Sequence, residues 1–148
     1  SLDEIKAIWG QMSIDKYRYE VPLKPGVPEF LKYCRENGIR TGIGTSNGSE
    51  IVDAVLTSLN VKEYFDVVVT ACEVAHGKPE PDIYLEVATR LGVKPEECLV
   101  FEDIPAGIMA GKAAGMPVIA VEDDFSKDLM DEKRALADAV IADYRELL

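Results

Sequence analysis

The chain has 148 residues, the length of one ordinary domain, and 47% of them are hydrophobic while 29% are charged. This balance supports one buried core and excludes a disordered protein, and no apolar run approaches the roughly 18 residues that a membrane span requires. The 16 basic and 27 acidic residues give a net charge of −11, which argues against binding to nucleic acid or to anionic membranes.

The first part of the chain predicts two helices and then the start of an alternating pattern. Residues 3–19 carry apolar side chains at helical spacing. The prolines and the glycine of VPLKPGVPEF interrupt that helix, and Pro28 suits the first turn of a second helix that ends at Gly38. An apolar strand is expected at 39–44 and a helix at 49–60.

The rest of the chain continues the alternation of strands and helices. Strands are expected at 65–71, 97–102, 116–121 and 139–143, and helices at 81–92, 105–115 and 126–136. Nearly continuous apolar strands that alternate with helices predict an α/β fold with a parallel sheet covered on both faces. Such a sheet binds its ligand beyond the carboxyl ends of its strands, so functional residues are expected there.

The three cysteines, Cys34, Cys72 and Cys98, are widely spaced and form no CxxC pair. They suggest neither a zinc site nor a disulfide framework, and each is expected to be a small buried thiol. A reducing, cytoplasmic compartment fits this pattern. The amphipathic start SLDEIKAIWG carries acids and has no feature of a signal peptide.

A hydroxyl-rich segment follows the strand at 39–44. Thr45, Ser46, Asn47 and Gly48 lie between that strand and the next helix. Hydroxyls and free backbone N–H groups at the start of a helix form a good anion site. Ser46 or Asn47 could equally serve only as the helix cap.

A lysine lies in the loop after the strand at 65–71. Lys78 stands between Gly77 and Pro79, and its stiff backbone suits a fixed positive charge for a phosphate. Taken alone, it is better described as a solvated loop lysine. His76, the only histidine of the chain, is expected to be solvated in the same loop.

Two acids end the strand at 97–102. Glu102 and Asp103 are costly to bury unless they are paired or bind a metal, and their oxygens suit Mg²⁺. The alternative is that Asp103 caps the helix that begins at Pro105. A hydroxyl, a lysine and an acidic pair on one rim suit a phosphoryl group bound with Mg²⁺.

The order TSN, GKPEPD and VFEDIPAGIMAGKAAGM resembles motifs II, III and IV of the haloacid dehalogenase superfamily. The likeness is greatest to the β-phosphoglucomutase and phosphatase-like subgroup with a helical cap, and it runs from about Pro25 to about Val121. It implies a Rossmann-like parallel sheet flanked by helices. It also implies Mg²⁺-dependent phosphoryl transfer on a small phosphorylated metabolite, such as a sugar phosphate, through an aspartyl-phosphate.

The resemblance also implies a role for each matched position. Thr45, with the two residues after it, would hold the transferring phosphoryl group. Lys78 would offset the charge on that group and on the nucleophile. Asp103 would bind Mg²⁺, with Glu102 as its neighbour in the metal site. Ile104 departs from the Ser or Thr that is common in the subgroup, at a position concerned with capping.

A larger departure concerns the nucleophile. The family carries it in a DxDGT-like motif on its first strand, and this sequence contains no such motif. Residues 1–24 resemble the tail end of the helical cap, and residues 25–148 resemble the core without the motif I strand. We therefore expect this chain alone to be inactive. The alternative function is a non-catalytic binding or interaction module, and a flavodoxin-like or receiver-like domain ranks lower because it does not explain GKPEPD.

In the family, the motif I strand lies between the strands that here end at Thr45 and Glu102. Without it, two inner edges would be unpaired and a groove would open in the core. Three outcomes are compatible with the sequence. The gene product is longer, another polypeptide or a swapped copy donates the strand, or the remaining strands close up into a rearranged sheet.

Overall fold

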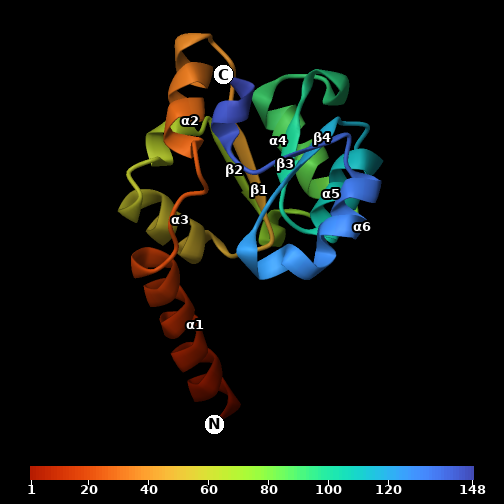
Figure 1. Ribbon diagram of the computed structural model, residues 1–148. Coiled ribbons are helices and arrows are strands. Elements are labelled where there is room, and N and C mark those ends of the chain that lie inside the picture. Colours follow the sequence, from red (N-terminus) through yellow and green to blue (C-terminus); the bar gives the residue numbers. More distant parts are fainter.

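The computed structural model describes residues 1–148, and its first element is a helix that projects from the rest of the molecule (Figure 1). This helix, α1 (Leu2–Tyr19), buries no residue and meets the body of the protein at α3 (Ser49–Ser58). Ser1 and Glu4 form a capping box at its start. None of the helices is both long and apolar enough to span a bilayer.

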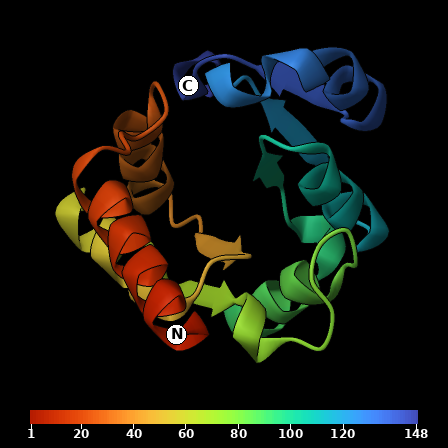
Figure 2. The ribbon, with the colours of Figure 1, turned by 90° about the horizontal axis from the view of Figure 1, so that it is seen from below.

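The strands form two separate parallel sheets. β1 (Gly42–Thr45) pairs with β2 (Val67–Thr70). In the other sheet, β4 (Val118–Val121) lies between β3 (Val100–Glu102) and β5 (Ala139–Ile141). No ladder joins β1 to β3, so each has an inner edge without a strand partner. Figure 2 shows β1 and β3 on the two sides of this break.

Five further helices flank the strands: α2 (Val27–Glu36), α3, α4 (Asp82–Leu91), α5 (Pro105–Ala113) and α6 (Met130–Leu136). Short 3-10 turns lie between the elements at Lys62–Tyr64, Ala71–Glu73, Pro95–Glu97 and Asp124–Leu129, and a last one follows β5 at Tyr144–Leu147. Local sequence sets the helix ends. In α4, Pro81 precedes the first turn, and Gly92 closes the helix in the left-handed region at φ +69°.

Helix α4 packs against both β1 and β2 and also contacts α5. Gly42 permits the approach to β1, because a Cβ there would lie 2.6 Å from Cγ1 of Val87. The main core is a cluster of 13 buried residues drawn from β2, α4, β3, α5, β4 and neighbouring turns. One apolar core therefore extends across both sheets, although no backbone hydrogen bond joins a strand of one sheet to a strand of the other.

The predicted elements are present in the predicted order, with shorter strands. The strand expected at 39–44 begins only at Gly42, because the Ile39 N–H donates to the Cys34 carbonyl and closes the end of α2. The strand expected at 97–102 begins at Val100, because Pro95–Glu97 forms a turn. The helix expected at 126–136 is regular only in α6, since Ser126 has non-helical dihedral angles.

The α/β fold with parallel strands flanked by helices is confirmed, and the two unpaired inner edges expected without a motif I strand are those of β1 and β3. The strands do not close up into one rearranged sheet. The prediction that all three cysteines are buried is wrong. Cys34 is buried and Cys98 is half-buried, but Cys72 is exposed because it lies in the 3-10 turn that leaves β2.

Candidate functional site

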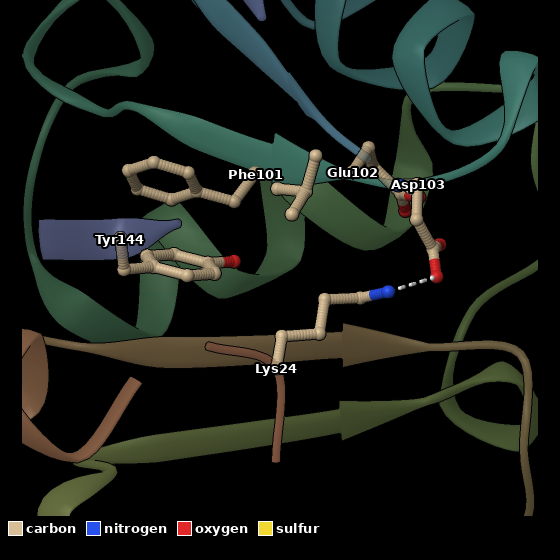
Figure 3. A pocket seen from close by; sticks show the side chains of 6 residues that line it. Lys24, Phe101, Glu102, Asp103 and Tyr144 are labelled. Carbon is tan, nitrogen blue, oxygen red and sulfur yellow. Dashed lines mark hydrogen bonds and ion pairs between the residues drawn. The ribbon is translucent and has the colours of Figure 1, made fainter. Parts of the chain in front are cut away.

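A pocket of about 160 Å³ lies at the carboxyl ends of β3 and β4, where an open α/β sheet is expected to bind its ligand (Figure 3). Six residues line it: Lys24, Phe101, Glu102, Asp103, Val121 and Tyr144. Phe101 and Tyr144 form its aromatic wall, with ring centroids 5.0 Å apart. The pocket thus combines an apolar wall with one cation and two adjacent acids.

Glu102 is buried at the inner side of this site. Its Oε1 accepts hydrogen bonds from Lys78 Nζ and from the Tyr84 hydroxyl, and its Oε2 accepts from the Asp103 N–H at 3.1 Å. The carboxylate lies against Gly107 in the first turns of α5, where a Cβ would be 2.0 Å from Glu102 Cδ. A buried carboxylate with these partners is stable only while they remain in place.

Lys78 is held against Glu102 and is not solvated, so its description as an ordinary loop lysine is wrong. Only 10% of its side chain is exposed, and its Nζ lies 5.0 Å from the centre of the Tyr84 ring. Its loop is tied to the start of α4, because Asp82 Oδ2 accepts from the His76 N–H at 3.2 Å. The His76 ring is exposed, as expected.

Two tyrosines near the acids keep their protons. Burial, together with the nearby Glu102 and Asp103 carboxylates, raises the pKa of Tyr84 well above its ordinary value of 10.0. Burial and the same two acids also raise the pKa of Tyr144. Both phenols therefore remain neutral hydrogen-bond donors across the physiological pH range.

Asp103 also lines the pocket, but it pairs with a different lysine from the one that pairs with Glu102. Its Oδ2 lies 3.2 Å from Lys24 Nζ, and Lys24 also donates to Asp123 Oδ2. That hydrogen bond from Lys24 is the main reason that the pKa of Asp123 is lowered. Burial acts to lower the pKa of Lys24, but the two carboxylates outweigh it and hold that pKa above 10.5. The two aspartates and the lysine therefore form one connected group of ion pairs.

A fully buried lysine supports the backbone behind Asp103. Lys133 Nζ donates to the Asp103 carbonyl at 3.0 Å, the Val121 carbonyl at 3.2 Å and Ser126 Oγ at 2.9 Å. Ser126 Oγ donates in turn to the Asp103 carbonyl at 2.9 Å. Lys133 therefore ties the ends of β3 and β4 together.

The structure does not join the hydroxyl segment to this site. Thr45 Oγ1 accepts from the Asn47 N–H at 3.1 Å, and no hydrogen bond or ion pair links Thr45, Ser46 or Asn47 to Lys78 or to the acids. Gly48 is the cap residue of α3, and no side chain caps that helix, so capping by Ser46 or Asn47 is wrong.

Capping by Asp103 is likewise wrong. The cap residue of α5 is Ile104, which makes no side-chain cap bond. The Asp103 carboxylate pairs with Lys24 and is thus available on the pocket side.

No group of three or more His, Cys, Asp or Glu side chains is arranged to hold a metal ion. Two carboxylates, those of Asp103 and Asp123, nevertheless converge on one cation, the Lys24 ammonium. Carboxylate oxygens are the donors that Mg²⁺ prefers, and water and phosphate oxygens commonly complete its octahedron. The donor chemistry present therefore fits Mg²⁺.

Sequence reasoning missed several residues of this site: Lys24, Tyr84, Asp123, Lys133 and Tyr144. Asp123 had a usable signal, because it follows the strand expected at 116–121 much as Asp103 follows the strand expected at 97–102. The two lysines gave none, since a lysine in a linker or a helix is usually solvated.

Comparison with known proteins gives consistent matches. The family model for haloacid dehalogenase-like hydrolases matches residues 4–115. Hexitol phosphatase B of Escherichia coli K12 is 34% identical over 126 residues, which cover 85% of this chain and 56% of that protein. Fructose-1-phosphate phosphatase YqaB of the same strain is 48% identical over 79 residues, 53% of this chain and 42% of that protein.

A solved structure supports the fold. The crystal structure of CbbY from Rhodobacter sphaeroides in complex with phosphate matches 90% of this chain and 60% of its own, with a TM-score of 0.82 and 29% identity. This chain spans about half the length of the curated relatives it matches.

Proposed function

This chain belongs to the haloacid dehalogenase-like hydrolases, and from that premise we propose that it forms part of the core of a phosphatase or phosphomutase for phosphorylated sugars. The observation that carries the proposal is the buried Lys78–Glu102 pair next to Asp103, at the carboxyl end of β3. The sugar class is supported by two relatives, a hexitol phosphatase and a fructose-1-phosphate phosphatase.

In the proposed mechanism, the Thr45 hydroxyl and the Ser46–Asn47 segment bind the oxygens of the phosphoryl group. Lys78 supplies a positive charge close to the reacting group. That charge is valuable in a chain with a net charge of −11. The tie between Asp82 and the His76 N–H helps to hold the lysine loop in place.

Asp103, with Glu102 beside it, would hold Mg²⁺. Glu102 Oε2 accepts one hydrogen bond from the protein and so keeps acceptor capacity for a further partner. When bound, Mg²⁺ would neutralise charge on the phosphoryl oxygens. Lys133 and Ser126 hold the Asp103 backbone in position for this role.

In the intact form, an aspartate carboxylate would attack phosphorus while the P–O bond to the substrate breaks and the substrate oxygen takes up a proton and leaves as an alcohol. Water or a second substrate would then take the phosphoryl group from the aspartyl-phosphate and restore the carboxylate. This sequence contains no DxDGT-like motif, so we propose that the chain alone does not turn over. The inner edges of β1 and β3 are unpaired. We propose that they accept a strand donated by another polypeptide or by a second copy of the chain.

The test adds such a strand in trans. The purified chain is assayed for Mg²⁺-dependent hydrolysis of p-nitrophenyl phosphate, alone and with a synthetic peptide that carries an apolar strand ending in a DxDGT-like motif. We expect activity only with the peptide and its loss in Asp103→Ala, whereas Asp128→Ala, an exposed acid, serves as the matched control. Hydrolysis by the chain alone that is lost in Asp103→Ala would refute the proposed inactivity.

The second candidate is a non-catalytic binding or interaction module, which rests on the same lack of a DxDGT-like motif. It predicts that no peptide restores hydrolysis. Both candidates fit a reducing, cytoplasmic compartment, which is supported by the three cysteines remaining free thiols.

A further inference from the structure

Three segments that are far apart in sequence meet at the pocket opening. Lys24 comes from the connection between α1 and α2, Asp103 follows β3 and Asp123 follows β4. The Lys24 ammonium is hydrogen-bonded to Asp123 Oδ2. It also lies 3.2 Å from Asp103 Oδ2, the contact that Figure 3 shows as a dashed line. Lys24 and Asp123 are 99 positions apart. One cation is therefore placed between two carboxylates.

The two carboxylates are directed at this cation by the backbone around them. Asp123 Oδ1 is already engaged, because it accepts from the Phe125 N–H at 2.8 Å, and this leaves Oδ2 for Lys24. The backbone of Asp103 is fixed by the buried Lys133. Neither carboxylate has another ion-pair partner. The arrangement is therefore a preformed cation-binding site, in which one oxygen of each carboxylate faces the cation.

The charges at this cation-binding site are not balanced. Two carboxylates and one ammonium leave a net charge of 1 − 2 = −1. The site is also open to exchange, since 28% of the Lys24 side chain, 39% of Asp103 and 20% of Asp123 are exposed. A divalent cation would neutralise the two carboxylates fully and would use the same oxygens.

We propose that Asp123 is a second carboxylate of the divalent-cation site at Asp103, and that the Lys24 ammonium occupies this site until a divalent cation displaces it. The inference rests on the Mg²⁺ site proposed above. It adds Asp123 as a ligand and the Lys24 ammonium as a cation that competes with Mg²⁺ for the site. Lys24 can withdraw, because its four-carbon stem is flexible and already reaches solvent. Binding of Mg²⁺ thus breaks the contact between the segment that joins α1 to α2 and the ends of β3 and β4.

The experiment measures Mg²⁺ affinity by isothermal titration calorimetry on the full chain at low salt. We compare the wild type with Lys24→Met, Lys24→Gln and Lys24→Gln/Asp123→Asn. Removing the competing ammonium should tighten binding about tenfold, as expected for loss of a nearby unit charge at a partly exposed site. Adding Asp123→Asn should reverse that gain. Lys62→Met removes a comparable Lys–Asp pair, with Asp53, and should leave affinity unchanged.

The outcomes separate this inference from the proposed function. Equal Mg²⁺ affinity in the wild type and both Lys24 variants overturns the competition while the Mg²⁺ site itself stands. No binding by any variant overturns both. Binding that tightens in the Lys24 variants and is unaffected by Asp123→Asn overturns the role of Asp123.

A second measurement does not depend on the folding of a variant. Wild-type chain labelled with ¹³C at lysine Cε is titrated with Mg²⁺ and observed by NMR. We expect the Lys24 signal to move toward the position of a free lysine, while that of Lys62 stays in place. A Lys24 signal that does not move while Mg²⁺ binds, as followed by calorimetry, overturns the inference.

Discussion

Replacement of Gly107 by alanine tests whether the Glu102 carboxylate is as tightly enclosed as the structure indicates. The new Cβ would lie 2.0, 2.2 and 2.3 Å from Cδ, Oε1 and Oε2 of Glu102, whereas ordinary contacts begin near 3.4 Å. The Glu102 backbone cannot yield easily, because it is paired with Ala120 in the second sheet. The carboxylate itself must therefore leave its position.

The cost follows from the bonds that the carboxylate makes. Displacement breaks the bonds from Lys78 and Tyr84, and a hydrogen bond to a charged group contributes about 1.5–3 kcal/mol. Alanine in place of glycine within a helix raises the free energy of unfolding by about 0.5–1 kcal/mol. We expect Gly107→Ala to lower the free energy of unfolding by about 2–5 kcal/mol, as the difference of these two contributions.

The free energy of unfolding is measured by urea denaturation followed by circular dichroism. Gly10→Ala is the matched control, because Gly10 lies inside α1 with no atom within 4 Å of a Cβ, and this change should stabilise its helix. In a Glu102→Ala background the clash is absent, so Gly107→Ala should become neutral or stabilising. If Gly107→Ala destabilises equally in both backgrounds, the enclosure of the carboxylate is not the cause.

Three other predictions concern stability and reactivity. Lys133→Met should lower the free energy of unfolding by about 2–4 kcal/mol in urea, because it removes the three hydrogen bonds that the buried ammonium donates, and an unchanged midpoint would contradict this. Cys72 should react with a disulfide reagent much faster than Cys34, which is buried and whose pKa is raised by that burial; equal rates would contradict the structure. Bonds from the Thr70 N–H and from Arg90 lower the pKa of Glu73 from 4.5 to about 2. A carboxyl group whose pKa is lowered in the folded state stabilises the fold at pH values above its ordinary pKa of 4.5, and that contribution is lost as pH falls toward 2. Glu73→Gln should therefore flatten the dependence of Tm on pH between those values, and an unaltered slope would disprove the role of this carboxylate.

The order and type of the elements could be predicted because their signals are local. Pro28, Pro81 and Pro105 lie in or next to the first turns of three helices, and Gly92 closes one of them. The split of the strands into two sheets could not be read from such signals. Strand pairing depends on non-local neighbours, and it was the family pattern, which places a further strand between β1 and β3, that led us to expect two unpaired inner edges.

Part of the site could also be predicted. The rule that ligands bind beyond strand ends found Lys78, Glu102 and Asp103, and the structure brings the first two into contact. It could not find Lys24, which reaches Asp123 across 99 positions of sequence. Contacts of that kind are fixed by the packing of whole segments, and no pattern near Lys24 encodes them.

The break between β1 and β3 also affects how the molecule responds to temperature. Much of the connection between the two sheets is apolar packing in the shared core, formed by residues such as Val69, Ile83, Val100, Ile108 and Val118. Apolar contacts weaken on cooling, whereas the backbone ladders inside each sheet do not depend on that force. Cooling therefore weakens the apolar part of the connection between the two sheets, and the polar contacts of Glu102 with Lys78 and Tyr84 become a larger share of what joins them.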